Sequence, residues 1–203
     1  MFIIGLTGGI ASGKSTISSM LGKLGAIIID ADKIGHEAYQ PHTVVWNDVV
    51  EAFGREILKE NDEIDRPKLG SIVFRDPEAM QRLNAIMHPR MFDMMKQRLE
   101  KVKQEGVRVA VIEAAILIEA NWTPLVDEVW VVYVPEDVAI QRLIARNGLS
   151  PEQARARVKS QMPIDDKAKL ADVVVDNNRS LAEVEVEVRN LWRRIQESAG
   201  ARN

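Results

Sequence analysis

The sequence predicts an α/β protein with three layers, in which helices lie on both sides of a parallel, five-stranded sheet. Five short runs are apolar almost throughout, as strands covered on both faces are. Helical patterns separate these runs, and strands that alternate with helices form parallel sheets with right-handed crossovers. The predicted strands are residues 2–7, 26–30, 107–112, 128–134 and 173–176.

Two predicted helices show their pattern most clearly. The helix after the first strand has apolar residues at Ile17, Met20, Leu21 and Leu24. The last helix places its apolar residues on one face and its glutamates and Arg194 elsewhere, which is typical of a helix with one buried side. That apolar face consists of Leu181, Val184, Val188, Leu191, Trp192 and Ile195.

Length and composition limit the class of protein. With 203 residues, the chain is long enough for one α/β domain and short for two. Its 27 basic and 30 acidic residues give a net charge of −3, so no strongly basic field favours nucleic acid. The sequence contains no cysteine, which excludes disulfides, thiolate metal sites and a cysteine nucleophile. No apolar run reaches the ~20 residues of a membrane span, and no leader is recognised. We expect a cytoplasmic protein, monomeric or weakly homo-oligomeric, without nucleic-acid or membrane partners.

A glycine-rich segment directly follows the first predicted strand. Gly8, four further residues and then Gly13-Lys14-Ser15 match the phosphate-binding pattern G-x-x-x-x-G-K-[ST]. The glycines let backbone N–H groups converge on phosphate oxygens, and the N-terminus of the following helix adds partial positive charge. Lys14 then reaches the β- and γ-phosphates, and the Ser15 hydroxyl can ligate Mg²⁺. The sequence therefore predicts a site for a nucleoside triphosphate.

Two stretches do not fit a minimal crossover. About 70 residues separate the second and third strands, far more than a crossover needs, with helical patterns at 44–53, 66–74, 77–87 and 89–105. We interpret this insertion as a helical flap for the second substrate. A second stretch, residues 139–169, is rich in arginine and lysine. We interpret it as a lid, and the alternative is a solvated charged helix. We thus predict one domain, with a core of residues 1–32, 107–138 and 170–203, an insertion of residues 33–106 and a lid of residues 139–169.

Several segments together resemble the dephospho-CoA kinase family. They are Gly5 to Thr16, Asp30-Ala31-Asp32, Asp65-Arg66 with Leu69 and Val73-Phe74, Leu83-Asn84 with His88-Pro89, Arg142-Leu143 with Arg146-Asn147, Gln153-Ala154-Arg155 with Arg157, Gln161, and Ala171-Asp172 with Asp176-Asn177-Asn178. These segments span nearly the whole chain in the family's order. The resemblance implies a P-loop NTPase fold and a kinase that uses ATP with Mg²⁺. Its expected reaction is phosphorylation of the ribose 3′-hydroxyl of dephospho-CoA to give CoA, the last step of coenzyme A biosynthesis.

The resemblance and the needs of phosphoryl transfer indicate the site residues. Asp32, two residues past the second strand, is the candidate base for the 3′-hydroxyl, with Lys14 and Arg142 as the other catalytic residues. ATP is expected to contact Gly9, Ala11, Ser12, Gly13, Lys14, Ser15, Thr16, Arg142, Arg146 and Asn177. Dephospho-CoA is expected to contact Asp32, Arg66 and His88. Mg²⁺ is expected at Ser15 and, through water, at Asp30.

The two aspartates have structural alternatives. Asp32 can be the N-cap of a helix that starts at Lys33, and a cap and a site carboxylate are not exclusive. Asp30 can orient Mg²⁺ or can simply end its strand. The spacing of these residues does not decide between the two roles of Asp30.

The residues assigned to the insertion and the lid have alternatives as well. His88 can be the last residue of a helix that ends before Pro89. Arg142 and Arg146 stand at i and i+4 on one helical face, so both can swing onto the phosphates when a lid closes. The alternative for this pair is an exposed pair of little energetic weight.

Three positions depart from the family's pattern. The turn after the third strand reads Glu113-Ala114-Ala115 without the proline that is frequent there, which changes backbone stiffness more than chemistry. Ala11 stands where glycine is usual, and its methyl group should be tolerated if its φ is negative. Asn178-Arg179 stands where Asn-Gly is common.

Three other classes of protein compete with this interpretation. A small-molecule kinase for a nucleoside or a sugar acid would share the core, and only the helical insertion separates the two. A GTP-driven switch would need a guanine-reading Asn-Lys-x-Asp segment, which the sequence lacks. A nucleic-acid-dependent ATPase would need a basic surface and a further motor domain.

Overall fold

The structure is a computed structural model that describes residues 1–200, with side chains described up to residue 197. The chain divides into two compact units. The first, here called the sheet unit, comprises Met1–Asp30 and Arg98–Asn203, and the second, the helical unit, comprises Ala31–Gln97. The functional parts predicted above, a substrate flap and a lid, remain predictions.

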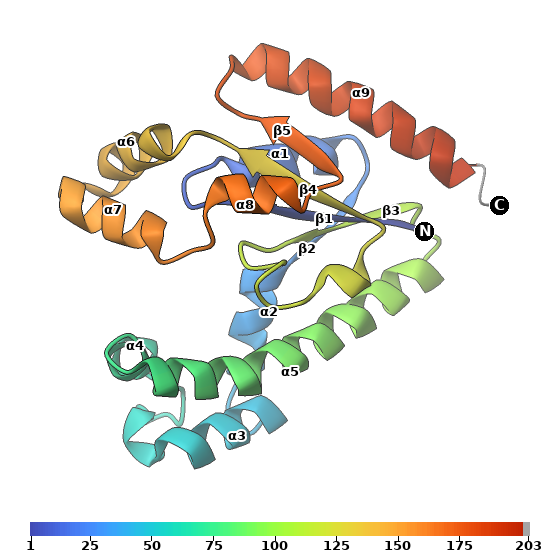
Figure 1. The fold of residues 1–203 in the computed structure, drawn as a ribbon. Helices are drawn as coiled ribbons and strands as arrows, with labels where there is room; N and C mark the ends of the chain where they lie inside the picture. The colour runs from blue at the N-terminus through green and yellow to red at the C-terminus, as the bar shows by residue number, and fades with distance from the viewer. Residues whose placement is uncertain (201–203) are drawn as a thin grey trace. The chain divides into compact units, whose positions relative to one another are not determined.

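A parallel sheet forms the centre of the sheet unit (Figure 1). Its five strands follow the order β2-β3-β1-β4-β5, and all four pairings are parallel. The predicted α/β sheet is therefore confirmed. The edge strands differ most from the expectation of full burial, because Ile27 and Val174 are exposed there. The strands are β1 (Phe2–Gly8), β2 (Ile27–Asp30), β3 (Val109–Glu113), β4 (Glu128–Tyr133) and β5 (Val173–Asp176).

The strand order makes β1 the point at which the chain changes direction across the sheet. From β1 the chain runs to β2 on one side, and after β3 it continues to β4 and β5 on the other. Ligands of open α/β sheets bind beyond the carboxyl ends of the strands at such a point. The segment that follows Gly8 at the end of β1 lies there. The topology thus places the glycine-rich loop where a ligand site is expected.

Two helices cover one face of the sheet, α1 (Lys14–Lys23) and α9 (Leu181–Gly200). In β1, Phe2, Ile4 and Leu6 point to this face because side chains alternate along a strand. The helices contribute Ile17, Leu21, Val184, Val188, Trp192 and Ile195 to the same buried cluster. Most of the predicted apolar face of the last helix is therefore buried, and Leu181 at its start is exposed.

The turn after β3 covers part of the opposite face. A Cβ added at Gly5 would lie 2.6 Å from Leu117 and 3.0 Å from Val126, so only glycine allows this close approach to β1. The short 3₁₀ helix η2 (Thr123–Leu125) then leads into β4. Glycine at position 5 thus brings the turn against the central strand.

Three helices occupy the segment between β4 and β5. They are α6 (Glu136–Asn147), α7 (Pro151–Lys159) and α8 (Ile164–Lys169). Gly148, with φ 63°, ends α6 in the left-handed conformation that glycine adopts easily. Ser150 and Gln153 then form a reciprocal capping box that starts α7.

The helical unit consists of short helices and most of one long helix. These are α2 (Ala31–Ala38), α3 (Val44–Phe53), the 3₁₀ helix η1 (Arg55–Ile57), α4 (Arg66–Val73) and α5 (Pro77–Gln104), whose last residues belong to the sheet unit. Side-chain caps start two of them: Thr43 accepts from the N–H of Trp46, and Asp65 from that of Lys68. None of the helices in the described part of the chain is long and apolar enough to cross a membrane.

The long helix corrects one prediction from the sequence. We expected two helices, 77–87 and 89–105, whereas α5 continues through Pro89. Proline removes one backbone hydrogen bond inside a helix. Its effect is outweighed because buried residues continue every fourth position on both sides of Pro89, at Ala79, Leu83, Met87, Met91, Met95 and Leu99.

The packing of α9 generates a prediction about stability. Val188 is fully buried and Val186, two residues earlier in the same helix, is 59% exposed. Val188→Ala should lower the free energy of unfolding by about 2 kcal/mol, since two methyl groups are lost and a cavity remains. Val186→Ala, the matched control, should change it by less than about 0.5 kcal/mol. Urea denaturation measures both, and equal effects would contradict the packing described for α9.

Candidate active site

The glycine-rich loop between β1 and α1 requires glycine at two positions. A Cβ at Gly8 would lie 2.7 Å from the backbone oxygen of Val132 in the neighbouring strand. Gly13 has φ 85°, and a Cβ there would lie 2.2 Å from the side-chain nitrogen of Asn177. Inside the loop, the N–H of Ser12 donates to the carbonyl of Gly9 at 3.2 Å. The pattern predicted from the sequence therefore adopts a tight loop packed against two strand ends.

The conformation of Ala11 does not meet the condition stated for it. Its φ is 59°, in the left-handed region, whereas we expected its methyl group to be tolerated at negative φ. This conformation costs an L-residue roughly 1–2 kcal/mol because Cβ approaches a backbone oxygen. The closed loop imposes the conformation on Ala11 despite this cost.

The first turn of α1 is arranged to receive an anion. Its N-cap is Gly13, which has no capping side chain, and no acidic residue occurs in the first turn. The first N–H groups of a helix have no partner within the helix, and the helix dipole adds positive charge there. Lys14, Ser15 and Thr16 begin this turn, and the latter two are exposed. A phosphate group would satisfy donors that the sequence leaves uncapped.

An ion pair fixes the loop lysine. The ammonium of Lys14 lies 2.9 Å from Oε1 of Glu113, and the two side chains are only 15% and 14% exposed. Glu113 ends β3, which pairs directly with β1. We did not identify Glu113 as a site residue from the sequence. The sequence does show an acidic residue at the end of the third strand. Its closeness to Lys14 follows only from the strand order, which places β3 beside β1.

The carboxylates near the loop fit a magnesium ion that is held largely by phosphates and water. Asp30 and Glu113 are paired across β2 and β3, so two carboxylates end neighbouring strands. The exposed Ser15 begins α1. Within the described part of the chain, no group of three or more His, Asp and Glu side chains could hold a metal. Mg²⁺ keeps several waters and takes one or two protein ligands in nucleotide sites, which this donor set permits.

Asn177 connects the loop to the segment after β4. Its side-chain nitrogen donates to the carbonyl of Ser12 at 2.7 Å, and its own carbonyl accepts from Arg142 at 2.9 Å. A guanidinium nitrogen of Arg142 lies 4.0 Å from the position that a Cβ at Gly13 would take. The structure therefore brings Asn177 and Arg142 to the loop.

A second contact reaches the loop from between α7 and α8. The side-chain oxygen of Gln161 accepts from the N–H of Ile10 at 2.8 Å. Arg146, by contrast, is exposed and donates to Asn147 in its own helix at 2.9 Å. The structure brings Gln161 to the loop and does not bring Arg146 there.

Asp32 lies in the first turn of α2, which begins at Ala31 directly after β2. The alternative of an N-cap for a helix starting at Lys33 is therefore wrong, because the helix begins two residues earlier. The carboxylate is on the exposed side of the helix, and the carbonyl of Asp32 contacts Nδ1 of His36 at 2.7 Å. The side chain of Asp32 is accessible from solvent.

The other two residues assigned to the second substrate also belong to the helical unit. His88 is inside α5, so its interpretation as a helix C-terminal residue is wrong. Burial lowers the pKa of His88 and thereby favours the neutral imidazole. Arg66 lies over the ring of Tyr39 at 5.1 Å, a cation–π contact. Arg66 and Tyr39 line a pocket of about 320 Å³ within this unit, together with His36, Gln40, Lys59 and Glu63, and His88 is not among its lining residues.

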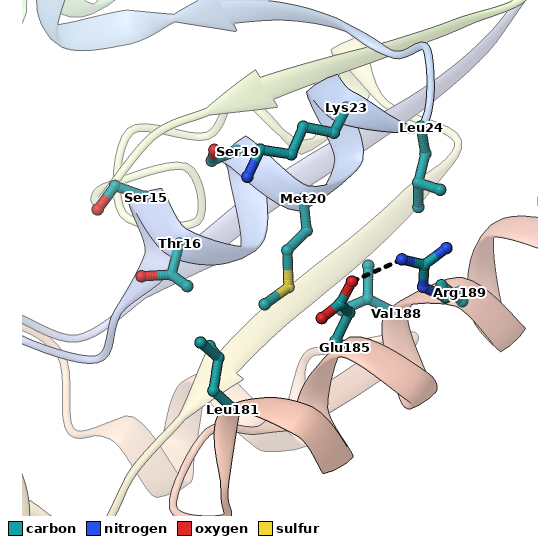
Figure 2. A pocket seen from close by; sticks show the side chains of 10 residues that line it. All are labelled: Ser15, Thr16, Ser19, Met20, Lys23, Leu24, Leu181, Glu185, Val188 and Arg189. Carbon is teal, nitrogen blue, oxygen red and sulfur yellow. Dashed lines mark hydrogen bonds and ion pairs between the residues drawn. The ribbon is translucent and has the colours of Figure 1, made fainter.

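A larger pocket of about 490 Å³ lies between α1 and α9. Figure 2 shows Ser15 and Thr16 at one end of this pocket and Met20 pointing across it from α1. On the α9 side, Arg189 donates to Glu185 at 2.6 Å. The hydroxyl-bearing face of α1 is therefore open to a ligand from its first turn onward.

Gly13 and Ala11 both have positive φ, and we expect substitution to impair the site at Gly13 and to stabilise the protein at Ala11. Gly13→Ala should lower kcat/KM for ATP by about 100-fold, because its Cβ would displace Asn177 or the loop by about 1 Å. Ala11→Gly should keep this value and raise the free energy of unfolding by up to about 1 kcal/mol, because the left-handed strain is relieved. Steady-state kinetics and urea denaturation test the pair. Normal kinetics for Gly13→Ala would show that this loop does not hold the nucleotide.

Comparisons with known proteins bear on the identity of this site. A family model described as dephospho-CoA kinase matches residues 2–183. The dephospho-CoA kinase of Geobacter sulfurreducens is 50% identical over 192 residues, which cover 95% of this chain and 98% of that protein. Among solved structures, dephospho-CoA kinase from Campylobacter jejuni has a TM-score of 0.72 at 30% identity, and the match covers 99% of this chain and 98% of that one.

A more distant structure shares the fold alone. Shikimate kinase from Acinetobacter baumannii has a TM-score of 0.57 at 15% identity, and the match covers 98% of this chain and 94% of that one. The same core is therefore used by kinases of other small molecules. The match to the family model, together with 50% identity along nearly the full length of a relative, is more specific than this shared core. The chain belongs to the dephospho-CoA kinase family.

Proposed function

We propose that this protein transfers the γ-phosphoryl group of ATP to the ribose 3′-hydroxyl of dephospho-CoA and so forms CoA. The observation that carries the proposal is the phosphate loop, with Lys14 paired to Glu113 and Arg142 beside Gly13. Family membership supplies the acceptor. A kinase for a nucleoside or a sugar acid is the competing function, and the acceptor distinguishes the two.

Holding and neutralising the phosphates is the task of the loop. Phosphoryl transfer depends mainly on positioning and on stabilising charge that spreads over the transferring oxygens. The N–H groups around Gly13 and the ammonium of Lys14 would hold the β- and γ-phosphates, and Thr16 would contact the α-phosphate. Arg142, which lies beside Gly13, would neutralise charge on the γ-phosphate.

Mg²⁺ is a proposed part of the site. When bound, it would neutralise negative charge on the phosphates of ATP. The Ser15 hydroxyl would be a direct ligand, while Asp30 and Glu113 would orient its water molecules. Gly9, Ala11 and Ser12 would shape the loop around the triphosphate, with Asn177 holding the carbonyl of Ser12.

Asp32 is the proposed base. Its carboxylate would accept the proton of the 3′-hydroxyl as the hydroxyl oxygen bonds to the γ-phosphorus and the bond from that phosphorus to ADP breaks. The place of Asp32, two residues after β2, and the family resemblance support this role. No other residue is needed to balance the step.

Arg66 and His88 are proposed to contact dephospho-CoA. Arg66 offers a charged, planar donor in a pocket of the helical unit, which suits a phosphate or adenine group. His88 would contribute a hydrogen bond without charge, because burial lowers its pKa. We further propose that the protein works in the cytoplasm as a monomer or weak homo-oligomer without nucleic acid, in line with its net charge of −3.

The position of the new phosphate tests the proposed function. The chain is incubated with ATP, Mg²⁺ and dephospho-CoA, and the product is treated with a 3′-specific nucleotidase. We expect a product with one added phosphate that the nucleotidase removes. Phosphate on another hydroxyl, or no transfer to dephospho-CoA by folded protein, would refute the proposal.

Substitution of Asp32 tests the proposed base. Asp32→Asn should lower kcat by about 10²- to 10⁴-fold with little change in ATP affinity, because the shape is kept and the proton acceptor is lost. Glu37→Gln, at another exposed carboxylate of α2, is the matched control and should retain normal kcat. Weaker ATP·Mg²⁺ binding with normal kcat would instead make Asp32 a residue of the metal site.

The lid is tested by amide exchange and by arginine substitutions. Exchange across residues 142–162 should slow when a non-hydrolysable ATP analogue and dephospho-CoA bind together, and should change less with either alone. Arg142→Ala with Arg146→Ala should lower kcat more than dephospho-CoA affinity, since their contacts strengthen in the transition state. Lys159→Ala, at an exposed residue of α7, is the control. Unchanged exchange, or ordinary kcat in the double variant, would favour the exposed-pair alternative.

A further inference from the structure

One buried charge in the sheet unit has no part in the mechanism proposed above. Lys167 in α8 is completely buried, with 0% of its surface exposed. An ammonium is buried at high cost unless it is paired and hydrogen-bonded. Its Nζ donates to the carbonyl of Ala115 at 2.7 Å and lies 2.8 Å from Oε1 of Glu119. Both partners belong to the turn after β3.

The carbonyl of Ala115 connects three elements. Besides Lys167, it accepts a hydrogen bond from the hydroxyl of Thr7 at 3.2 Å. Thr7 is the residue of β1 immediately before Gly8, where the phosphate loop begins. One residue earlier in the turn, the N–H of Ala114 donates to the carbonyl of Leu6 at 3.0 Å. Hydrogen bonds therefore connect the turn both to the end of β1 and to α8.

The turn after β3 begins directly after Glu113, the ion-pair partner of Lys14. Glu113 directly precedes Ala114 and holds the ammonium of Lys14 at 2.9 Å. Ala114 and Ala115 have no ring that would fix φ, so the path of this backbone depends on its hydrogen bonds. A shift of the Ala115 carbonyl would move Glu113, two residues away, and would release Thr7 beside the loop.

We propose that Lys167 is a positioning residue for phosphoryl transfer. By holding the carbonyl of Ala115, it fixes the turn after β3 and, through that turn, the Lys14–Glu113 pair. Lys167 touches no reacting group, and Glu119 neutralises its charge inside the protein. The inference rests on the proposed function only for its kinetic readout.

Three variants separate positioning from mere stability. Lys167→Met removes the donor and leaves the carboxylate of Glu119 buried without its partner. Adding Glu119→Gln removes this unpaired charge and should recover most of the lost thermal stability, but it cannot restore the bond to Ala115. Lys169→Met is the matched control, because Lys169 lies in the same helix but is exposed and pairs with the exposed Asp166.

The kinetic readout is kcat per folded molecule with saturating ATP and dephospho-CoA. Lys167→Met and the double variant should lose about 10- to 100-fold in kcat, as expected for misplacement of a catalytic group by about 1 Å. The KM for dephospho-CoA should stay within about threefold, and Lys169→Met should match the unaltered protein. Normal kcat in a folded Lys167→Met or double variant would overturn the proposal.

Amide exchange provides a readout that does not depend on turnover. In the double variant, exchange should accelerate at residues 114–119 and 8–13 and stay unchanged in α9. Unchanged exchange in the turn and the loop would overturn the positioning role even if kcat fell. If the unaltered chain itself fails to phosphorylate dephospho-CoA, the proposed function is wrong, while the exchange experiment still decides the role of Lys167.

Discussion

The contact between Asn177 and the phosphate loop is the constraint on which the site depends. The side-chain nitrogen of Asn177 donates to the carbonyl of Ser12 and occupies the space that a Cβ at Gly13 would need. Because the peptide bond between Ser12 and Gly13 is planar and trans, a carbonyl held by Asn177 turns the N–H of Gly13 the opposite way. The backbone carbonyl of Asn177 also holds Arg142. One asparagine after an edge strand thus sets both the loop and an arginine beside it.

The strand order supplies the rest of the arrangement. With β1 between β3 and β4, the carboxyl ends of three strands meet around the loop, and Glu113 at the end of β3 reaches Lys14. The turn that follows Glu113 is in turn held by Thr7 and Lys167. Three buried polar side chains, Thr7, Lys167 and Asn177, therefore hold the backbone that positions the charged groups of the site, because each donates a hydrogen bond to a backbone carbonyl. Buried hydrogen bonds of this kind restrict the turn and the loop to one geometry.

The fold was largely predictable from the sequence because its signals are local. Apolar runs and the glycine pattern identify the strands and the loop without knowledge of their partners. The continuous helix through Pro89 was not predicted, since a proline signal is local and the burial that outweighs it is not. The left-handed φ of Ala11 is imposed by closure of the whole loop. The Lys14–Glu113 pair joins residues 99 positions apart, so it requires the strand order.

The most direct measurement is ADP release in a coupled assay with dephospho-CoA beside adenosine, shikimate and gluconate as acceptors. The protein and ATP are the same in all four assays, so a difference in rate reports on the acceptor alone. The acceptor is the part of the function that the shared fold does not determine. We predict a kcat/KM for dephospho-CoA that exceeds each of the other values by more than about 100-fold. An equal or higher value for adenosine, shikimate or gluconate would contradict the assignment of this chain as a dephospho-CoA kinase.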